Sequence, residues 1–480
     1  MAEMNSLKSL MDQNFLGYAS YVIKERAIPN IDDGLKPVQR RILHTLSEVD
    51  DGKYHKVANV VGHTMRYHPH GDASIEDALV NIAQKNYFID QQGNFGNVIT
   101  GDPASAARYI ECRLSPLARE TIFDDEITEY VDSYDGRNKE PVCLPAKIPS
   151  LLMSGVEGIA VGLSTKILPH NFNELLEAQI KILKGQPFDI YPDFIQGGLI
   201  DVSEYQKGKG RVKIRAKIEI SDNKTLTIRE VPFSTNTESL IASIENAITR
   251  GKLKISTISD FTGETVEIEL KMGHGIQAHE ILPRLFLYTD CEVSVTSNVV
   301  VIKDDLPVET DVHEILNHNT NKLITLLERE LGCKLEKLNV KLHERLLIKT
   351  FIENKLYLSI EKAETFEELK FLLNESLQPF ASDMIREISD DDLEKLLSIP
   401  IKRISKFDMN KTFEEIQEIK TNIEEIENNL SNIISYTIKY LKELIKKYGK
   451  NYSRRTTIEA FESIDITRVA VQDLKVGYDK

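Results

Sequence analysis

Residues 37–49 read PVQRRILHTLSEV, a stretch with the pattern of a helix that begins with proline. Val38, Ile42 and Leu46 recur every four residues and predict one apolar face. At about 100° per residue, Arg40 falls about 200° round the helix from Val38. We therefore expect Arg40 on the opposite, exposed face.

Two further short helical patterns follow, around Val57, Val60 and Val61 and then around Ile75, Leu79 and Ile82. A glycine-rich stretch at 93–111 comes next and has a strand-like pattern. Three short helices followed by such a strand suggest a winged helix-turn-helix. Residues 6–27 precede them and predict an N-terminal helix that stops before Pro29.

The rest of the chain changes pattern twice. From about 150 to 310, apolar and polar residues alternate, as in VKIRAKI at 212–218, and predict a strand-rich α+β region. From 312 onward the pattern is helical, with two seams of apolar residues three and four positions apart. The first seam is Leu331, Leu335, Leu338 and Leu342. The second is Ile416, Ile419, Ile423, Ile426, Leu430 and Ile433, and it continues one position out of phase with Ile434, Ile438, Leu441, Ile445 and Tyr448.

These two seams favour an antiparallel pair of long helices, with residues 350–410 as a cap at the far end. The alternative is a parallel homodimeric zipper, which we disfavour because one chain already holds both seams. Asp390, Asp391 and Asp392 could resemble a metal cluster. We interpret them as the acidic first turn of a helix, which the helix dipole favours.

Composition restricts the class of protein. With 480 residues and 41% hydrophobic residues, the chain should form two to four folded units. Its four cysteines lie far apart and indicate a reducing compartment. We expect a cytoplasmic protein without membrane insertion, because the sequence lacks a signal-peptide core and any apolar run of about 18 residues.

Charge gives a mixed indication about nucleic acid. The net charge of -15 argues weakly against such a partner, yet residues 24–66 hold eight cations against six acids. The sequence also lacks a phosphate-binding P-loop, an H-E-x-x-H motif and a G-x-G-x-x-G turn after a strand. We therefore expect this chain to bind no nucleotide by itself, so that any ATP dependence would come from a partner.

Two clusters could carry chemistry: four cations, Arg26, Lys36, Arg40 and Arg41, and the loop YHPHGD at 67–72. Arginine suits bidentate phosphate contacts, and histidine can donate to a phosphate or bind a metal. Surface salt bridges and a histidine-capped helix explain these residues equally well, so both interpretations stay open at this point.

Six short motifs between Ser20 and Asn171 give a family resemblance. They are RAIP at 26–29, DGLKPVQRR at 33–41, YHPHGD at 67–72, QGNFG at 92–96, ARYIE at 107–111 and GIAVG at 158–162. In this order they resemble the breakage-reunion subunit of bacterial type IIA topoisomerases, the A subunits of DNA gyrase and topoisomerase IV.

The resemblance implies a multidomain α+β fold with a winged-helix DNA-gate domain, a strand-rich tower domain and a long antiparallel coiled coil that carries a helical C-gate dimerisation domain. The implied boundaries are an N-terminal helical arm at 1–28, a breakage-reunion domain at 29–150, a tower at 151–311, a first coiled-coil arm at 312–349, a C-gate region at 350–410, a returning arm at 411–450 and a C-terminal tail at 451–480.

The resemblance assigns the catalytic roles. The tyrosine matching Tyr109 attacks a DNA phosphodiester and leaves a 5′-phosphotyrosyl link and a free 3′-hydroxyl. Arg108 would stabilise the transition state, and Arg26 would hold the scissile phosphate. We expect Glu111 to form a local salt bridge with Arg108 or Arg113.

The remaining matched positions concern DNA and drugs. Lys36, His68 and His70 match DNA contacts, and Arg40 and Arg41 belong to the same basic element. Ile159 matches an isoleucine that wedges between base pairs and bends the duplex. At the family's quinolone site, Ala73 stands in place of the usual serine and Asp77 matches the acid. Ser74 is one residue off and should not substitute.

Partners and cofactors follow from the same resemblance. Mg²⁺ and ATP would be supplied by a partner ATPase/Toprim subunit in an A2B2 heterotetramer with a homodimer of this chain, acting on double-stranded DNA at the nucleoid. The short C-terminus suggests a topoisomerase IV-like subunit without a β-pinwheel wrapping domain. A gyrase A core cut before that domain is one alternative, and a non-catalytic DNA-binding coiled-coil scaffold is another.

Overall fold

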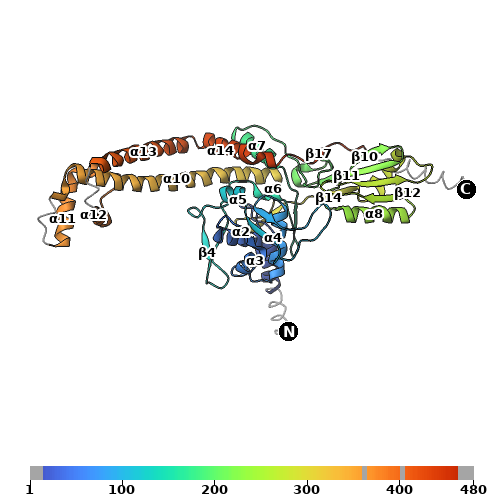
Figure 1. Cartoon of the computed structure of the whole chain (residues 1–480), viewed down its shortest axis with the longest axis horizontal. Helices are drawn as coiled ribbons and strands as arrows, with labels where there is room; N and C mark the ends of the chain where they lie inside the picture. The colour runs from blue at the N-terminus through green and yellow to red at the C-terminus, as the bar shows by residue number, and fades with distance from the viewer. Residues whose placement is uncertain (1–13, 359–364, 400–405, 463–480) are drawn as a thin grey trace, which may run out of the picture. The chain divides into compact units, whose positions relative to one another are not determined.

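The computed structural model describes residues 14–358, 365–399 and 406–462. It mixes helices and strands and divides into two compact units, as expected for a multidomain α+β protein. The first unit contains residues up to Leu323 and again from Leu441, and the second contains Ile324 to Tyr440. Figure 1 labels their elements. The finer domain boundaries given above stay predictions.

The first unit begins with a helix at 14–22 that continues as a π-helix, η1 (Ile23–Ala27), and ends before Pro29 as predicted. Residues 1–13 of the predicted arm lie outside the described residues. The three short predicted helices are confirmed as α2 (Pro37–Glu48), α3 (Val57–Thr64) and α4 (Asp72–Gln84). They pack through fully buried side chains that include Ile42, Val57 and Leu79.

A small antiparallel sheet closes this helical core. Its order is β1 (His55–Lys56), β3 (Glu111–Leu114) and β2 (Ile89–Gln92). The strand predicted over 93–111 is wrong for most of its length, since 93–110 form a loop. Gly93, Gly96 and Gly101 have φ values of 99°, 80° and 91°, and these left-handed conformations interrupt a β-ladder.

Short elements link this core to the strand-rich part. They are α5 (Pro116–Thr121), the hairpin β4 (Tyr130–Asp132) and β5 (Lys139–Pro141), α6 (Ser150–Ser154), the hairpin β6 (Val156–Ile159) and β7 (Ser164–Ile167), and α7 (Phe172–Leu183).

Two four-stranded sheets confirm that the middle of the chain is rich in strands. One has the order β10 (Lys217–Asp222), β11 (Thr225–Glu230), β13 (Ile268–Met272) and β12 (Ile255–Asp260), and shares a core with α8 (Thr237–Thr249) and α9 (Ala278–Tyr288). The other has the order β14 (Glu292–Thr296), β9 (Arg211–Arg215), β8 (Leu199–Asp201) and β17 (Thr457–Ile458). A hairpin, β15 (Val300–Lys303) and β16 (Leu306–Glu309), follows.

The alternating stretch 212–218 contributes to both sheets. It divides at Ala216, so that β9 belongs to one sheet and β10 to the other. Alternation predicts a strand but gives no indication of where the chain changes sheets.

The region predicted as a C-terminal tail is partly structured. A turn of 3₁₀-helix, η6 (Gly449–Asn451), leads to β17, which pairs in parallel with β8. Arg454 forms a salt bridge to Glu174 on α7 and donates to two backbone oxygens in the segment before β8, those of Tyr191 and Pro192. Residues 463–480 of the predicted tail lie outside the described residues.

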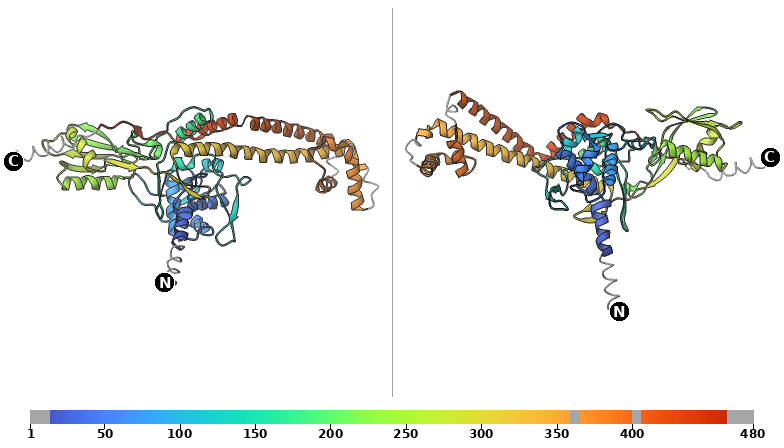
Figure 2. Two further views of the ribbon diagram at one scale, coloured as in Figure 1. Left: turned by 180° about the vertical axis from the view of Figure 1, so that it is seen from behind. Right: turned by 60° about the horizontal axis from the view of Figure 1, so that its bottom comes forward.

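The second unit is helical. It is built from the greater part of α10 (Val312–Glu353), with α11 (Phe366–Leu377), the 3₁₀-helix η4 (Gln378–Asp383), α12 (Asp390–Leu397), α13 (Lys406–Ser431) and the start of α14 (Ile433–Tyr448). Within this unit α10 and α13 lie side by side (Figure 2), with Leu338, Leu342 and Leu346 against Ile416, Ile419 and Ile423. Arg345 also pairs with Glu415.

These contacts join later residues of α10 to earlier residues of α13, so the two helices run antiparallel. The preferred interpretation of the two seams is therefore confirmed for this pair. The phase shift in the sequence coincides with a break at Asn432, between α13 and α14. Beyond it the predicted seam is right at Leu441 and Tyr448, which are buried, and wrong at Ile434, which is exposed. Ile438 and Ile445 are half-buried, and their neighbours Thr437 and Leu444 are buried instead.

The three consecutive aspartates form the first turn of α12, as predicted. Ser389 is the N-cap, and its side chain and that of Asp392 form a capping box. Asp392 is buried and also accepts two hydrogen bonds from Arg386. Together the Ser389 cap and Arg386 explain why a carboxylate is tolerated there.

Candidate active site and DNA-binding groove

Tyr109 is presented to solvent by the loop between β2 and β3. Its side chain is 64% exposed, and the guanidinium carbon of Arg108 lies 4.5 Å from its ring centroid. The predicted nucleophile and the predicted transition-state cation are thus adjacent in space as well as in sequence. A large aromatic side chain left so exposed has little packing role.

The backbone on both sides of Tyr109 is held firmly. Before it, the Ala107 N–H donates to Glu76 on α4 at 3.0 Å, and the Ala107 carbonyl accepts from Ala58 on α3 at 3.2 Å. After it, the Ile110 carbonyl accepts from Val57 at 3.0 Å, and the Ile110 side chain is buried. The loop therefore fixes the backbone while leaving the tyrosine ring free for a substrate.

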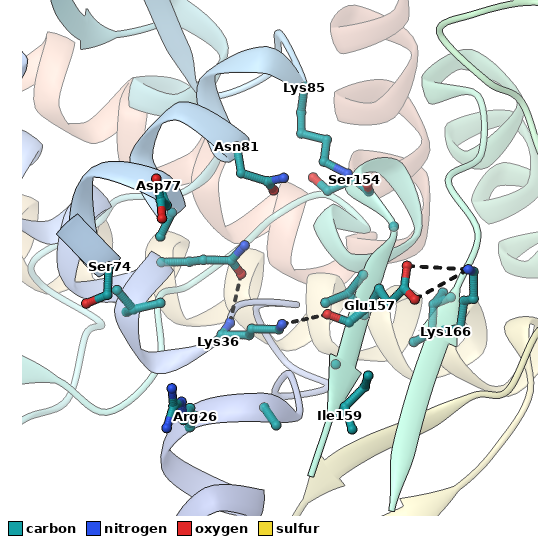
Figure 3. Close-up of a pocket in the computed structure, with 18 of the residues that line it drawn as sticks. Arg26, Lys36, Ser74, Asp77, Asn81, Lys85, Ser154, Glu157, Ile159 and Lys166 are labelled. Atoms are coloured by element: carbon teal, nitrogen blue, oxygen red, sulfur yellow. Dashed lines mark hydrogen bonds and ion pairs between the residues drawn. The ribbon is translucent and has the colours of Figure 1, made fainter. Parts of the chain in front are cut away.

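A groove of about 890 Å³ lies elsewhere in the first unit (Figure 3) and gathers most of the other predicted residues. Arg26, Lys36, His68, His70, Asp77 and Ile159 line it. Its lining has four cations, Arg26, Lys36, Lys85 and Lys166, against three acids, Glu25, Asp77 and Glu157. The lining therefore carries one more cation than acid, in a chain whose net charge is -15. Arg108, Tyr109, Arg40, Arg41 and Ala73 are not among the residues that line it.

Arg40 is not on an exposed face, which corrects the prediction. Its guanidinium donates to both carboxylate oxygens of buried Asp33, at 2.6 and 3.0 Å. Burial works against the charge, but Asp33 more than offsets it and raises the pKa of Arg40. The simple helical wheel failed because a charged side chain can be buried when a partner satisfies it. In this arrangement Arg40 supports the helix and has little capacity left for a phosphate.

Arg41 is also engaged within the protein. It donates to both carboxylate oxygens of Glu140, at 2.6 and 3.1 Å, and to Nδ1 of His68 at 3.2 Å. Because arginine can only donate, Nδ1 of His68 must accept, and neutral His68 carries its proton on Nε2. Burial, with the charges of Arg41, His70 and Arg26, lowers the pKa of His68 to about 4. His68 is therefore neutral near pH 7 and can offer one hydrogen bond but no charge.

His70 joins the groove to the N-terminal arm. The Tyr21 hydroxyl lies 2.7 Å from Nε2 of His70, and the two rings meet edge to face. His70 remains exposed, so its ring is accessible from the groove.

Ile159 stands at the end of β6 with 80% of its side chain exposed. This excludes a role for Ile159 as an ordinary core residue of the strand. The strand before it packs tightly, because a side chain on Gly158 would meet the Ala27 carbonyl oxygen at 2.1 Å. Glycine at 158 thus lets the hairpin lie against η1, while the next residue, Ile159, projects.

The predicted drug-site residues lie at the start of α4. Ala73 and Asp77 are one turn apart and exposed. The Ser74 hydroxyl lines the groove but donates to the Gly71 carbonyl at 2.7 Å. That bond engages the Ser74 hydroxyl within its own helix.

Glu111 has a different partner from the one expected. It pairs at 2.7 Å with Lys56, its neighbour across β1 and β3. Arg113 instead pairs with Asp90 and lies over the ring of Tyr54. Cross-strand register, which the sequence does not reveal here, decides the pairing.

Sequence reasoning missed three residues that shape the site: Glu76, Lys85 and Lys166. Glu76 anchors the nucleophile loop, and the two lysines line the groove. The spacing of Glu76 and Lys85 along α4 contained no motif that could have revealed them. The described residues contain no group of three or more His, Cys, Asp or Glu side chains arranged to hold a metal ion.

Comparison with known proteins decides the family. The family model for the A subunit of DNA gyrase/topoisomerase IV matches residues 26–442. The chain belongs to this family. It is 47% identical, over 98% of its length, to the A subunit of DNA topoisomerase 4 from Borreliella burgdorferi. It is 32% identical to the DNA gyrase A subunit of Streptomyces coelicolor over 95% of its length, and to the DNA topoisomerase 4 A subunit of Bacillus subtilis over 99%.

The predicted family and the enzyme class that goes with it, type II topoisomerase, are thus confirmed. The gyrase alternative is not favoured over the topoisomerase IV-like one, since the Borreliella relative has the higher identity. The chain spans 75% of that relative, 56% of the Streptomyces relative and 62% of the Bacillus relative. No helix among the described residues is long and apolar enough to cross a membrane.

Proposed function

We propose that this chain is the DNA-cleaving and rejoining subunit of a topoisomerase IV-like enzyme. The observation that carries the proposal is the exposed Arg108 and Tyr109 pair on an anchored loop, in a chain that belongs to the family of gyrase and topoisomerase IV A subunits. The helices α2 to α4 with the sheet of β1, β3 and β2 would be the winged-helix part of the DNA gate, and the strand-rich part the tower.

In the proposed reaction the Tyr109 hydroxyl oxygen attacks a DNA phosphorus. The bond from phosphorus to the 3′ oxygen breaks, which leaves a 5′-phosphotyrosyl ester and a 3′-hydroxyl. A tyrosine hydroxyl ordinarily ionises only near pH 10, so cations must favour the developing charge. Arg108 would supply one. Rejoining is the reverse step and needs no added energy, because the ester conserves that of the phosphodiester.

Arg26 would hold the scissile phosphate from the groove side. Lys36 and His70 would bind neighbouring phosphates, and His68 would donate one hydrogen bond from Nε2. Backbone contacts of this kind give affinity with little sequence readout. The projecting Ile159 would enter the base stack and bend the duplex. Arg40 and Arg41 would act through Asp33 and Glu140, which hold the helix beneath these residues.

The partners of the enzyme are part of the proposal. A double-strand break needs two tyrosines, which a two-fold homodimer provides. The metal is also part of the proposal. Mg²⁺ would be held by carboxylates of a Toprim partner and would stabilise phosphoryl charge there. That partner would also bind ATP, giving an A2B2 enzyme that acts on chromosomal DNA in the cytoplasm.

The test is to trap the covalent intermediate. The chain is mixed with its ATPase/Toprim partner, Mg²⁺ and end-labelled DNA, and denaturant is added quickly. We expect label that stays with the protein through denaturation and is released by protease digestion. DNA binding without any such adduct would favour the non-catalytic scaffold.

A further inference from the structure

We propose that Lys85 and Lys36 together hold the hairpin of β6 and β7, so that Lys85 is a positioning residue for the DNA wedge Ile159. The inference rests on the proposed function, because it takes Ile159 as the wedge. The place of the hairpin in the free protein can nevertheless be measured without DNA.

Lys85 reaches the start of the hairpin from the end of α4. It is the C-cap residue of that helix, and its Nζ donates to the Ser154 carbonyl at 2.8 Å. Ser154 ends α6, and only Gly155 separates it from β6. Figure 3 shows the Lys85 side chain extending towards Ser154 on one side of the groove. The lysine therefore fixes the point at which the chain turns into the hairpin.

Lys36 bonds to the chain three residues further on, within β6. It is the N-cap residue of α2, and its Nζ donates to the Glu157 carbonyl at 2.7 Å (Figure 3). The two ammonium groups thus come from the ends of two core helices and bind carbonyls three residues apart in one segment. Each bond is charge-assisted, which makes it stronger than a bond between neutral groups.

The hairpin has other contacts too, since Lys166 on β7 exchanges backbone hydrogen bonds with Asn298 and Gly158 on β6 lies against Ala27. The two lysines add support at the start of the hairpin and along β6. Each strand of the hairpin has four residues, and an isolated two-stranded hairpin is marginally stable in water. Ile159 cannot anchor it, because that side chain projects into solvent. Gly155, at the joint, has φ of 61°, and an added side chain there would meet the Ile167 carbonyl at 2.8 Å. Glycine is therefore required at this joint, and close contacts surround the point where the chain enters the hairpin.

The surroundings of Lys85 disfavour its charged form. Burial lowers its pKa, and the positive charge of Lys36 lowers it further. Its ammonium group donates to the Ser154 carbonyl, which is a neutral acceptor. Lys85 could serve either to fix the Ser154 carbonyl or to bind a DNA phosphate. The two roles predict different effects of a Lys85 substitution on hairpin exchange and on the salt dependence of DNA binding.

The test compares Lys85→Met, which keeps the length of the side chain but removes the ammonium, with Lys85→Arg, which restores a donor. Lys184→Met is the matched control, since it removes one positive charge outside the groove. Amide hydrogen exchange of residues 156–167 is measured in the free protein. Energy transfer across a labelled duplex reports bending, and affinities at several salt concentrations report phosphate contacts. Each Lys85 variant is also measured in the Ile159→Ala background.

We expect Lys85→Met to speed exchange in the hairpin and to lower the ratio of bent to straight duplex about tenfold, as for loss of a hydrogen bond to a charged group. Lys85→Arg should recover most of the bending, and Lys184→Met should change neither measurement. In the Ile159→Ala background Lys85→Met should have no further effect on bending, because it acts through that side chain.

Three results would overturn the inference. Unchanged exchange in the hairpin of Lys85→Met would show that the lysine does not hold it. A salt dependence reduced by about one phosphate contact would make Lys85 a direct DNA contact instead. Bending that is lost with Ile159→Ala but kept with Lys85→Met would refute the positioning role alone, whereas bending kept with both would refute the wedge itself.

Discussion

The guanidinium of Arg108 lies over the ring of Tyr109, with its central carbon 4.5 Å from the ring centroid. Attraction between the cation and the face of the ring keeps the two side chains together. A substrate phosphate that approaches the tyrosine hydroxyl therefore meets a positive charge that is already in place.

Arg108→Ala should reduce DNA cleavage by about a hundredfold to a thousandfold, as for removal of one donor to a developing negative charge. Arg113→Ala is the matched control, because Arg113 lies over Tyr54 in the same way, at 4.4 Å. Rates of adduct formation with an excess of the partner would compare them. Equal losses in both variants would indicate a structural effect and refute the role of Arg108.

Arg40→Met should destabilise the fold by about 3 to 5 kcal/mol, since it leaves the buried carboxylate of Asp33 without its partner. The salt dependence of DNA binding should stay unchanged, because Arg40 does not contact phosphate in this account. Urea unfolding and binding titrations would measure the two effects. A variant that unfolds normally but binds DNA with one phosphate contact fewer would restore Arg40 as a DNA ligand.

Acid should destabilise the protein partly through His68. Its folded pKa, about 4, lies below the ordinary value of 6.5, so the unfolded chain takes up a proton first as pH falls. The contribution of neutral His68 to the free energy of unfolding is complete above pH 6.5 and is lost progressively as the pH falls towards 4. We measure the free energy of unfolding in urea at about pH 7.5 and about pH 5. Its decrease between these pH values should be about 1 to 2 kcal/mol smaller for His68→Gln than for the wild type. Identical losses would mean that His68 is not held neutral.

Quinolone sensitivity should rise when the missing serine is restored. The resemblance implies that quinolones are held through water by a serine and an acid of this helix. Ala73 offers no hydroxyl for such a contact, and the Ser74 hydroxyl already bonds to Gly71. Ala73→Ser should need a few-fold to about tenfold less drug for half-maximal cleavage, as for one gained hydrogen bond. Equal drug concentrations for the two proteins would refute the assignment of this position.

Local patterns predicted the fold well where one element could be read by itself. The helices α2 to α4 and the antiparallel pairing of α10 with α13 followed from apolar spacing, and the phase shift marked the break at Asn432. Pairings between distant segments could not be predicted in this way. The parallel contact of β17 with β8 pairs Thr457 with Leu199, which lie far apart in the sequence, and nothing in either short strand specifies the other.

The functional site likewise has residues that sequence motifs identified and others whose role depends on tertiary contacts. Motifs identified Tyr109 and Ile159, and both side chains are exposed, as their proposed roles need. The burial of Arg40 depends on Asp33, and that of Arg41 on Glu140, which is 99 residues away in the sequence. Whether a cation faces DNA or a buried acid depends on such tertiary pairs, which periodicity does not reveal.

The identity of the nucleophile can be tested most directly by mapping the protein residue that becomes linked to DNA. Tyr109→Phe keeps the ring but removes the oxygen that would form the ester, and Tyr134→Phe is a control at another tyrosine that is 58% exposed. With the ATPase/Toprim partner, Mg²⁺ and labelled DNA, we expect no denaturant-resistant adduct from Tyr109→Phe, normal DNA binding, and normal adducts from Tyr134→Phe. Covalent adducts that persist in Tyr109→Phe would contradict the account.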